Sequence, residues 1–177
     1  MSAEISLSSE RIYQGRVINL RVDTVRLEDG KVSKREIIEH RGAVALVPID
    51  ENGDILLVKQ YRRAADRELL EIPAGTLEVG EDPLACAHRE LEEETGFRAS
   101  QMELLTAFFP VPGYSTEFIR LYLATGLQVA TKGGDEDEDI EVVPTSLTQA
   151  LDMIKSGEIC DGKSIIGLLL YASRKGM

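Results

Sequence analysis

The chain has 177 residues, of which 43% are hydrophobic and 29% charged, and its 31 acidic and 20 basic residues give a formal net charge of −11 at pH 7. This composition can bury a core, which excludes a disordered or collagen-like chain and predicts one soluble domain with at most a small appendage. The longest apolar stretch, residues 165–172, is shorter than the roughly 20 residues of a membrane span, and the N-terminus lacks a signal pattern, so we expect a cytoplasmic protein.

The first half of the chain has the pattern of β-strands joined by tight turns. Residues 16–40 alternate apolar and polar positions on both sides of Asp29 and Gly30, a dipeptide that favours a type I′ turn, and this predicts a β-hairpin. Short apolar, β-branched runs predict further strands at 42–49, 54–60 and 69–72. A turn at 51–53 joins the first two of these, and a polar loop at 61–68 leads to the third.

One central helix and two later helices complete the pattern. After a turn at residues 73–75, Asp82 can cap a helix that begins at Pro83, and Gly96 fits the left-handed residue that ends it. Two strands follow, then two helices, predicted at 104–109, 118–124, 145–156 and 163–174. Together these elements predict a mixed α/β (α+β) architecture built in layers.

The acidic residues are concentrated in two short segments. Residues 71–97 hold eight acids and one base, and residues 135–141 hold six acids, whereas the rest of the chain is close to neutral. Such patches repel a polyanion, and no basic stripe compensates for them, so we expect no nucleic-acid partner. Clustered carboxylates suit hard cations instead.

The helix at 83–95 separates apolar from acidic side chains. At about 100° per residue, one face holds Leu84, Ala87 and Leu91, and the adjoining face holds Glu90, Glu93 and Glu94. Cys86 falls on the acidic side, where its small side chain would leave room for a ligand, and we expect Cys86 and Cys160 to be free thiols. Three acids within one turn repel one another, which favours a bound cation; a solvated acidic face is the alternative.

The spacing around this helix is more specific than the helix itself. From Gly75, five residues precede Glu81, seven more precede Arg89-Glu90-Leu91, and Glu93-Glu94 and then Gly96-Phe97 follow after one residue each. These nine positions over 23 residues resemble the complete Nudix box. The stretch VKQYRRAADRELLEIPAGTLEVGEDP, and Pro112 at 15 residues beyond Phe97, further resemble the ADP-ribose pyrophosphatase branch of the Nudix hydrolases.

This resemblance implies a fold and a division of the chain. Residues 42–177 would form a Nudix hydrolase domain, with a mixed β-sheet sandwiched between helices. Residues 1–41 would form an N-terminal β-hairpin or antiparallel extension that mediates dimerisation, often by exchange between subunits. From the sequence alone, an alternating hairpin would look the same if it packed on its own chain.

The resemblance also assigns roles to the residues of the box. The metal ligands would be three carboxylates and one main-chain carbonyl, those of Glu90, Glu93, Glu94 and Ala74, with Glu93 in the catalytic set as well. Arg89 and Glu81 would pair to hold the loop and the helix together, and Gly75 and Gly96 would shape the backbone. Mg²⁺, for which Mn²⁺ would substitute, prefers oxygen ligands, and one bound water would become the nucleophile.

The acidic loop at 132–139 would supply the remaining catalytic carboxylates. In the resemblance, Glu136 is chosen as the general base and Glu138 as a further metal ligand, although neither spacing nor composition excludes the reverse order. A loop that swings a carboxylate onto a metal-bound water would couple substrate binding to activation. A solvated segment without a catalytic role is the alternative.

Substrate contacts would come from charged residues outside the box. The matching QYR segment favours Arg62 over its neighbour Arg63 as the residue that reaches a phosphate, and Arg35 and Glu36 lie on the hairpin that could cross to a partner subunit. Glu117, in the loop before the strand at 118–124, would orient the diphosphate or its water network. An ordinary surface charge is the alternative for each.

The resemblance predicts an enzyme, a pyrophosphohydrolase that converts ADP-ribose to AMP and ribose 5-phosphate. The box handles only the diphosphate, so another nucleoside diphosphate sugar, such as ADP-glucose or GDP-mannose, is the first alternative. The second is a catalytically silent nucleotide-binding module; such modules commonly lose box carboxylates, and all are present here. We expect a homodimer without a membrane partner.

Overall fold

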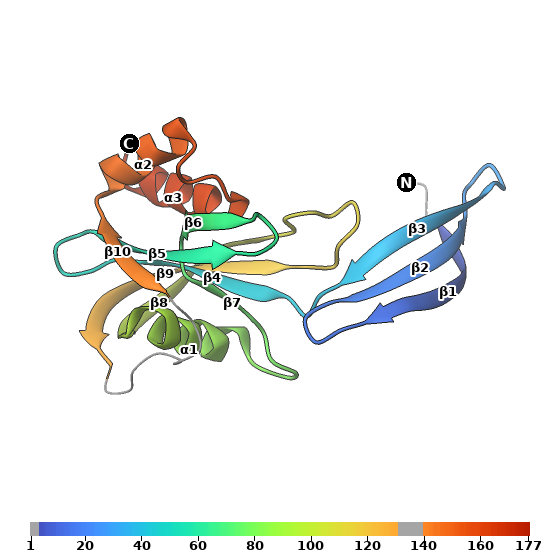
Figure 1. The fold of residues 1–177 in the computed structure, drawn as a ribbon, viewed down its shortest axis with the longest axis horizontal. Coiled ribbons are helices and arrows are strands. Elements are labelled where there is room, and N and C mark those ends of the chain that lie inside the picture. The colour runs from blue at the N-terminus through green and yellow to red at the C-terminus, as the bar shows by residue number, and fades with distance from the viewer. Residues whose placement is uncertain (1–3, 131–139) are drawn as a thin grey trace. The chain divides into compact units, whose positions relative to one another are not determined.

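The computed structural model describes residues 4–130 and 140–177 (Figure 1). These residues form two compact units: one combines the chain up to Gly42 with Phe109–Phe118, and the other combines Ala43–Phe108 with the chain from Ile119 onward. The predicted loop with Glu136 and Glu138 lies outside the described residues. None of the helices within the described residues is long and apolar enough to cross a membrane.

The first unit is built on an antiparallel sheet in the order β1, β2, β3. Its strands are β1 (Ile5–Gln14), β2 (Asn19–Arg26) and β3 (Val32–Glu39). The predicted hairpin is present as β2 and β3, and Gly30 in its turn has a φ of 84°, in the left-handed region that favours glycine. β1 is absent from the prediction because residues 8–11, which are all polar, interrupt the alternation of its sequence.

The loop Phe109–Phe118 belongs to the same unit. It runs beside the end of β3, to which backbone hydrogen bonds join it. The N–H of Ile38 donates to the carbonyl of Tyr114 at 2.7 Å, and the N–H of Thr116 donates to the carbonyl of Ile38 at 2.9 Å. This loop contains Pro112 and Glu117, so both residues lie beside the sheet of the N-terminal unit.

The second unit contains two sheets and three helices within the described residues. One sheet has the order β7, β4, β9, β8 and the other the order β10, β5, β6. The strands are β4 (Ala43–Pro48), β5 (Ile55–Arg62), β6 (Arg67–Glu71), β7 (Ala74–Thr76), β8 (Phe97–Phe108), β9 (Ile119–Val129) and β10 (Glu141–Thr145). The helices are α1 (Pro83–Thr95), α2 (Leu147–Ser156) and α3 (Gly162–Arg174), and Figure 1 shows α1 on one side of the sheets and the other two on the opposite side.

Strand β4 explains why the unit has two apolar clusters. Its side chains alternate: Val44 and Leu46 join the cluster of α1, while Ala45 and Val47 join the cluster of α2 and α3. Every residue of β4 is buried, as expected for a central strand covered on both faces. β4 pairs in parallel with β9 and antiparallel with β7, so the sheet is mixed, as predicted.

The structure departs from the predicted elements mainly in strand length. β8 and β9 extend beyond 104–109 and 118–124 because their added residues pair with each other although several are exposed. β10 is an additional edge strand, a position at which Pro144, without a backbone donor, is tolerated. β6 begins at Arg67, inside the predicted loop, because it pairs with the end of β5. α2 and α3 agree with the predicted ranges within two residues.

Candidate active site

The limits of helix α1 are set by its own sequence. The carboxylate of Asp82 accepts hydrogen bonds from the N–H groups of Leu84 and Ala85 at 3.0 and 3.1 Å, and Pro83 needs no donor at the first helical position. At the other end Gly96 has a φ of 74° and terminates the helix. The predicted limits are confirmed.

The buried stripe of α1 differs from the predicted apolar face. It follows positions 86–87, 90–91 and 94–95, four residues apart. The placement of Leu84 in the core and of Cys86 on an open acidic side is therefore wrong: Leu84 is exposed, and Cys86 is fully buried in the apolar cluster. The corrected stripe puts two carboxylates, those of Glu90 and Glu94, among buried residues, which excludes a solvated acidic face for both.

Glu90, Glu93 and Glu94 are brought together beside the turn that precedes the helix. Glu90 and Glu94 are only 9% and 8% exposed. Nη1 of Arg89 donates to Oε1 of Glu90 at 2.7 Å and to Oε2 of Glu93 at 2.8 Å. The N–H of Ala74 donates to Oε2 of Glu94 at 2.9 Å, so the turn and the helix are joined through a carboxylate.

The turn approaches α1 so closely that a side chain at position 75 would displace the carboxylate of Glu90. A Cβ atom on Gly75 would lie 1.8 Å from Cδ of Glu90, far inside van der Waals contact. Gly75 pairs with Val44 of the buried strand β4, which prevents the main chain from withdrawing. Glycine at position 75 leaves the Glu90 carboxylate in place, whereas at position 96 the positive φ favours it.

Arg89 also ties the loop before α1 to the helix. Its Nε and Nη2 donate to the two carboxylate oxygens of Glu81 at 2.9 and 3.0 Å. These hydrogen bonds lower the pKa of Glu81 to about 2, and the same carboxylate raises the pKa of Arg89. Burial raises the pKa of the Cys86 thiol to about 12, so this side chain stays protonated at neutral pH. Cys86 and Cys160 are free thiols, as predicted.

The donor set of the box suits a hard divalent cation. Three carboxylates lie within about one helical turn, and two of them are buried, where like charges repel strongly. The guanidinium of Arg89 pairs with two of the three, Glu90 and Glu93, and with Glu81 as well. Within residues 4–130 and 140–177 no group of three His, Cys, Asp or Glu side chains already stands in a metal-binding arrangement. The chemistry of the oxygens fits a metal, while Arg89 now bridges Glu90 and Glu93.

The predicted substrate-binding residues are distributed over both units. Arg62 lies at the end of β5 in the second unit. In the N-terminal unit the guanidinium of Arg35 pairs with the carboxylate of Glu4, which raises the pKa of Arg35. Glu36 lies on the same strand, and Glu117 lies in the loop Phe109–Phe118, where its N–H donates to the hydroxyl of Ser115 at 3.1 Å.

Sequence reasoning does not single out Glu71, although its carboxylate is the centre of a buried ion network. Glu71 ends β6, is 3% exposed, and accepts hydrogen bonds from Nε of Arg62 at 2.7 Å and from Nζ of Lys163 at 2.9 Å. An acid between Leu70 and Ile72, inside an apolar run, is the signal that could have found it. Its partner Lys163 is 92 positions away, so no local pattern shows the pairing.

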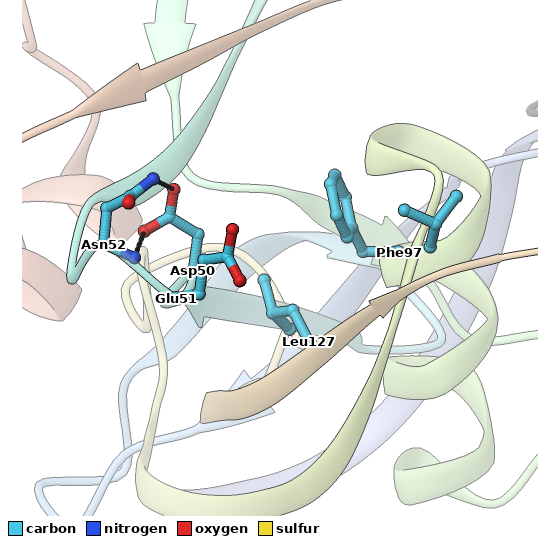
Figure 2. A pocket seen from close by; sticks show the side chains of 6 residues that line it. Asp50, Glu51, Asn52, Phe97 and Leu127 are labelled. Atoms are coloured by element: carbon cyan, nitrogen blue, oxygen red, sulfur yellow. Dashed lines mark hydrogen bonds between the residues drawn. The ribbon is translucent and has the colours of Figure 1, made fainter.

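A pocket of about 200 Å³ opens on the second unit, lined by Asp50, Glu51, Asn52, Phe97, Leu127 and Val129. Figure 2 shows Asp50 turned toward Asn52, whose backbone N–H and side-chain amide donate to its carboxylate at 2.9 and 3.3 Å. The pocket shares Phe97 with the box but none of its carboxylates. Its walls therefore do not bear on the chemistry of the acidic residues of α1.

Comparisons with known proteins agree on one family. The NUDIX domain matches residues 39–163, and the nucleoside diphosphate sugar hydrolase N-terminal domain matches residues 4–38. The chain is 46% identical to a methanol dehydrogenase activator of Bacillus methanolicus, over 93% of this chain and 90% of that protein. It is 44% identical to an ADP-ribose pyrophosphatase of Bacillus subtilis (strain 168), over 91% of this chain and 88% of that protein.

A solved structure supports the fold. The crystal structure of an ADP compounds hydrolase matches with a TM-score of 0.86 at 23% identity, over 98% of this chain and 95% of that chain. The predicted Nudix fold is confirmed, and Nudix hydrolases generally need divalent metal ions. Because the NUDIX domain matches most of the chain, including the turn at 73–75, the box and helix α1, the chain belongs to the NUDIX family.

Proposed function

We propose that this chain hydrolyses ADP-ribose, with one water molecule, to AMP and ribose 5-phosphate. The observation that carries the proposal is the burial of Glu90 and Glu94 on α1, directly beside the turn at 73–75. The relative from Bacillus subtilis bears the name of this activity and is similar over most of this chain. A pyrophosphohydrolase needs such an anionic site to hold metal ions against a diphosphate.

We propose Mg²⁺ as the cofactor, with Mn²⁺ as a substitute. Glu90, Glu93 and Glu94, with the main-chain carbonyl of Ala74, would hold the ion, which when bound offsets charge on the diphosphate and lowers the pKa of a bound water. Before binding, Arg89 shares its Nη1 between Glu90 and Glu93. Those two contacts can open while the hydrogen bonds from Arg89 to Glu81 keep the guanidinium in place.

We propose that a carboxylate of the acidic loop at 132–139 accepts the proton of the attacking water. Glu136 is the proposed general base and Glu138 a further metal ligand, and the resemblance to the family supports both roles. Glu136→Gln should lower kcat more than Glu138→Gln, and Glu138→Gln should raise the Mg²⁺ concentration needed for half-maximal rate. The opposite result would exchange the two roles.

The N-terminal extension, residues 1–41, is proposed to form a homodimer. Its sheet leaves large apolar side chains exposed: Ile5, Leu7, Ile12, Tyr13 and Val32. We take several large exposed apolar side chains on one small sheet as support for an interaction surface. In the dimer, Arg35, Glu36 and Glu117 would contact substrate together with Arg62. Light scattering after size-exclusion chromatography should give the mass of a dimer, and Ile12→Asp should shift it to that of a monomer.

The cysteines and the net charge bear on the location and the partners of the protein. We propose a cytoplasmic location, because two free cysteines suit a reducing compartment. We propose no nucleic-acid partner, because the net charge of −11 repels a polyanion.

The test is product analysis by chromatography. The protein is incubated with ADP-ribose and separately with ADP-glucose, GDP-mannose and NADH, in Mg²⁺ or in EDTA. Equal amounts of AMP and ribose 5-phosphate, abolished by EDTA and formed fastest from ADP-ribose, would support the proposal. Binding of ADP-ribose without turnover of any compound would contradict it and favour a silent module.

The second candidate is hydrolysis of a different nucleoside diphosphate sugar. Residues 4–38 match the nucleoside diphosphate sugar hydrolase N-terminal domain. This match favours the second candidate, because nucleoside diphosphate sugars include compounds with sugars other than ribose. The box chemistry would be the same for each sugar. Faster turnover of ADP-glucose or GDP-mannose than of ADP-ribose in the same assay would select this candidate.

A further inference from the structure

We infer that Glu71 is a positioning residue that holds the guanidinium of Arg62 ready for the diphosphate of the substrate; this inference rests on the proposed function and deepens it. Glu71 is 3% exposed, and its carboxylate is shared between two cations from different elements. Nε of Arg62, on β5, donates to Oε2 at 2.7 Å. Nζ of Lys163, on α3, donates to Oε1 at 2.9 Å.

The contact with Glu71 uses one edge of the Arg62 guanidinium and leaves the other available. Among the described residues, Arg62 donates a hydrogen bond only from Nε, and its side chain is 38% exposed. The two outer nitrogens, Nη1 and Nη2, are a pair with which arginine can bind a phosphate through two parallel hydrogen bonds. An arginine already held at Nε loses less side-chain entropy when the anion binds.

Arg63, the next residue, shows the alternative state of an arginine on the same segment. Its side chain is 87% exposed and pairs with Asp66, which is itself 77% exposed. Such surface pairs contribute little and hold no fixed geometry. Of two adjacent arginines, only Arg62 pairs with a buried carboxylate, and Arg63 provides a comparison with an exposed arginine of the same segment.

Lys163 makes the burial of Glu71 tolerable without taking the oxygen that Arg62 uses. Its Nζ lies 2.9 Å from Oε1 of Glu71 and 2.9 Å from Oδ1 of Asp161, the residue that caps α3. A buried carboxylate without such a partner would be costly. Lys163 thus balances charge and fastens β6 to α3, while Oε2 remains for Arg62. A purely structural role of Glu71 would consist of the Lys163 contact alone.

The experiment separates these two roles of Glu71. ADP-ribose binding is measured by isothermal titration calorimetry in EDTA, where turnover stops, and kcat and KM are measured in Mg²⁺. For Glu71→Gln we expect Kd and KM to rise about tenfold while kcat stays within about threefold, because substrate is held less well and the box is untouched. Added to Arg62→Ala, Glu71→Gln should cause no further loss of affinity, since the group that it positions is gone.

Matched variants complete the design. Lys163→Met should lower the melting temperature about as much as Glu71→Gln but leave Kd near the wild-type value, and Arg63→Ala should change neither quantity. If Glu71→Gln does not fold, Glu71→Asp keeps the buried charge but withdraws the carboxylate, and the same rise in Kd is expected.

Two results would overturn the inference. One is an equal loss of affinity in Lys163→Met and Glu71→Gln, which would mean that Glu71 only fastens β6 to α3. The other is a loss in Glu71→Gln that multiplies with that of Arg62→Ala. A wild-type protein that neither binds nor hydrolyses ADP-ribose would overturn the proposed function instead. Binding and turnover of the wild-type protein are therefore measured before any variant is compared.

Discussion

Two charge clusters of the second unit differ in their balance of acids and bases. In the box cluster, defined as Glu81, Arg89, Glu90, Glu93 and Glu94, the described contacts set one guanidinium against several carboxylates. In the Glu71 cluster, defined as Arg62, Glu71, Asp161 and Lys163, two acids meet two cations. As defined, the first cluster has four carboxylates and one guanidinium, a surplus of acids that suits a divalent cation, whereas the second has two acids and two bases. The balance of charge, more than the number of charged side chains, separates a cluster that can take up a cation from one whose acids are already paired with bases.

The largest expected effect comes from removing one charge of the box cluster. Glu94→Gln should lower kcat at least about 100-fold, because the electrostatic contribution of a bound metal is worth several kcal/mol. Its melting temperature should stay within about 3 °C of wild type, since the amide oxygen of Gln can still accept the hydrogen bond from Ala74. Steady-state kinetics and a thermal melt check both.

Glu92→Gln is the matched control for that variant. Glu92 lies on the same helix but pairs with Arg98, outside the box cluster. It should keep wild-type kcat. A grossly unfolded Glu94→Gln protein, or one that is fully active, would contradict the assignment of the metal site.

The next effect comes from space rather than charge. Gly75→Ala places a methyl group against the carboxylate of Glu90, so we expect a loss of about 1–3 kcal/mol in the free energy of unfolding together with a fall in activity. Urea denaturation measures the stability. Gly113→Ala, where no atom lies within 4 Å of the added Cβ, should change neither. Unaltered stability in Gly75→Ala would show that β7 can move away from α1.

A smaller effect depends on pH. The pKa of Glu81 is lowered from 4.5 to about 2, so its pair with Arg89 contributes stability that is fully present above pH 4.5 and is lost as the pH falls toward 2. At pH 7 wild type should exceed Glu81→Gln by about 1–2 kcal/mol in free energy of unfolding. This difference should shrink when both proteins are denatured in urea at successively lower pH. A difference that grew on acidification would refute the sign.

The smallest effect is chemical. Cys86 is buried and its pKa is raised to about 12, whereas Cys160 is exposed. Iodoacetamide at neutral pH should therefore label Cys160 and spare Cys86 until the protein unfolds. Mass spectrometry of the digested protein locates the label, and Cys160→Ser should abolish labelling of the folded protein. Rapid labelling of Cys86 would mean that the core beneath α1 opens readily.

The box cluster can be predicted from the sequence because its partners are close along the chain. Glu81 and Arg89 are eight positions apart, and the cap, the proline and the glycine of α1 fix which loop and which helix carry them. The phase of the buried stripe cannot be predicted in this way. Periodicity gives the spacing of buried positions, but the packing of Cys86 and Leu91 beside Leu46 of β4 decides which positions they are.

The Glu71 cluster and the edge strands are beyond such local reasoning. Lys163 meets Glu71 only when α3 packs beside the end of β6, and the chain between them is 92 positions long. β1 and β10 take much of their order from pairing with a neighbouring strand, which their own alternation does not encode. Predicting these features requires knowledge of which elements pack together, which the sequence of a single segment does not contain.

Ser164 carries a consequence for how the protein is made. Its buried hydroxyl accepts the N–H of Ile72 at 2.8 Å, one residue after Glu71 and immediately before the turn that meets Glu90. The ribosome synthesises α3 after every other element described here, and folding during synthesis proceeds from the N-terminal side. The turn at 73–75 takes its contacts from β4 and α1, which are made earlier, whereas the hydrogen bond that holds Ile72 just before it can form only after translation has passed Ser164.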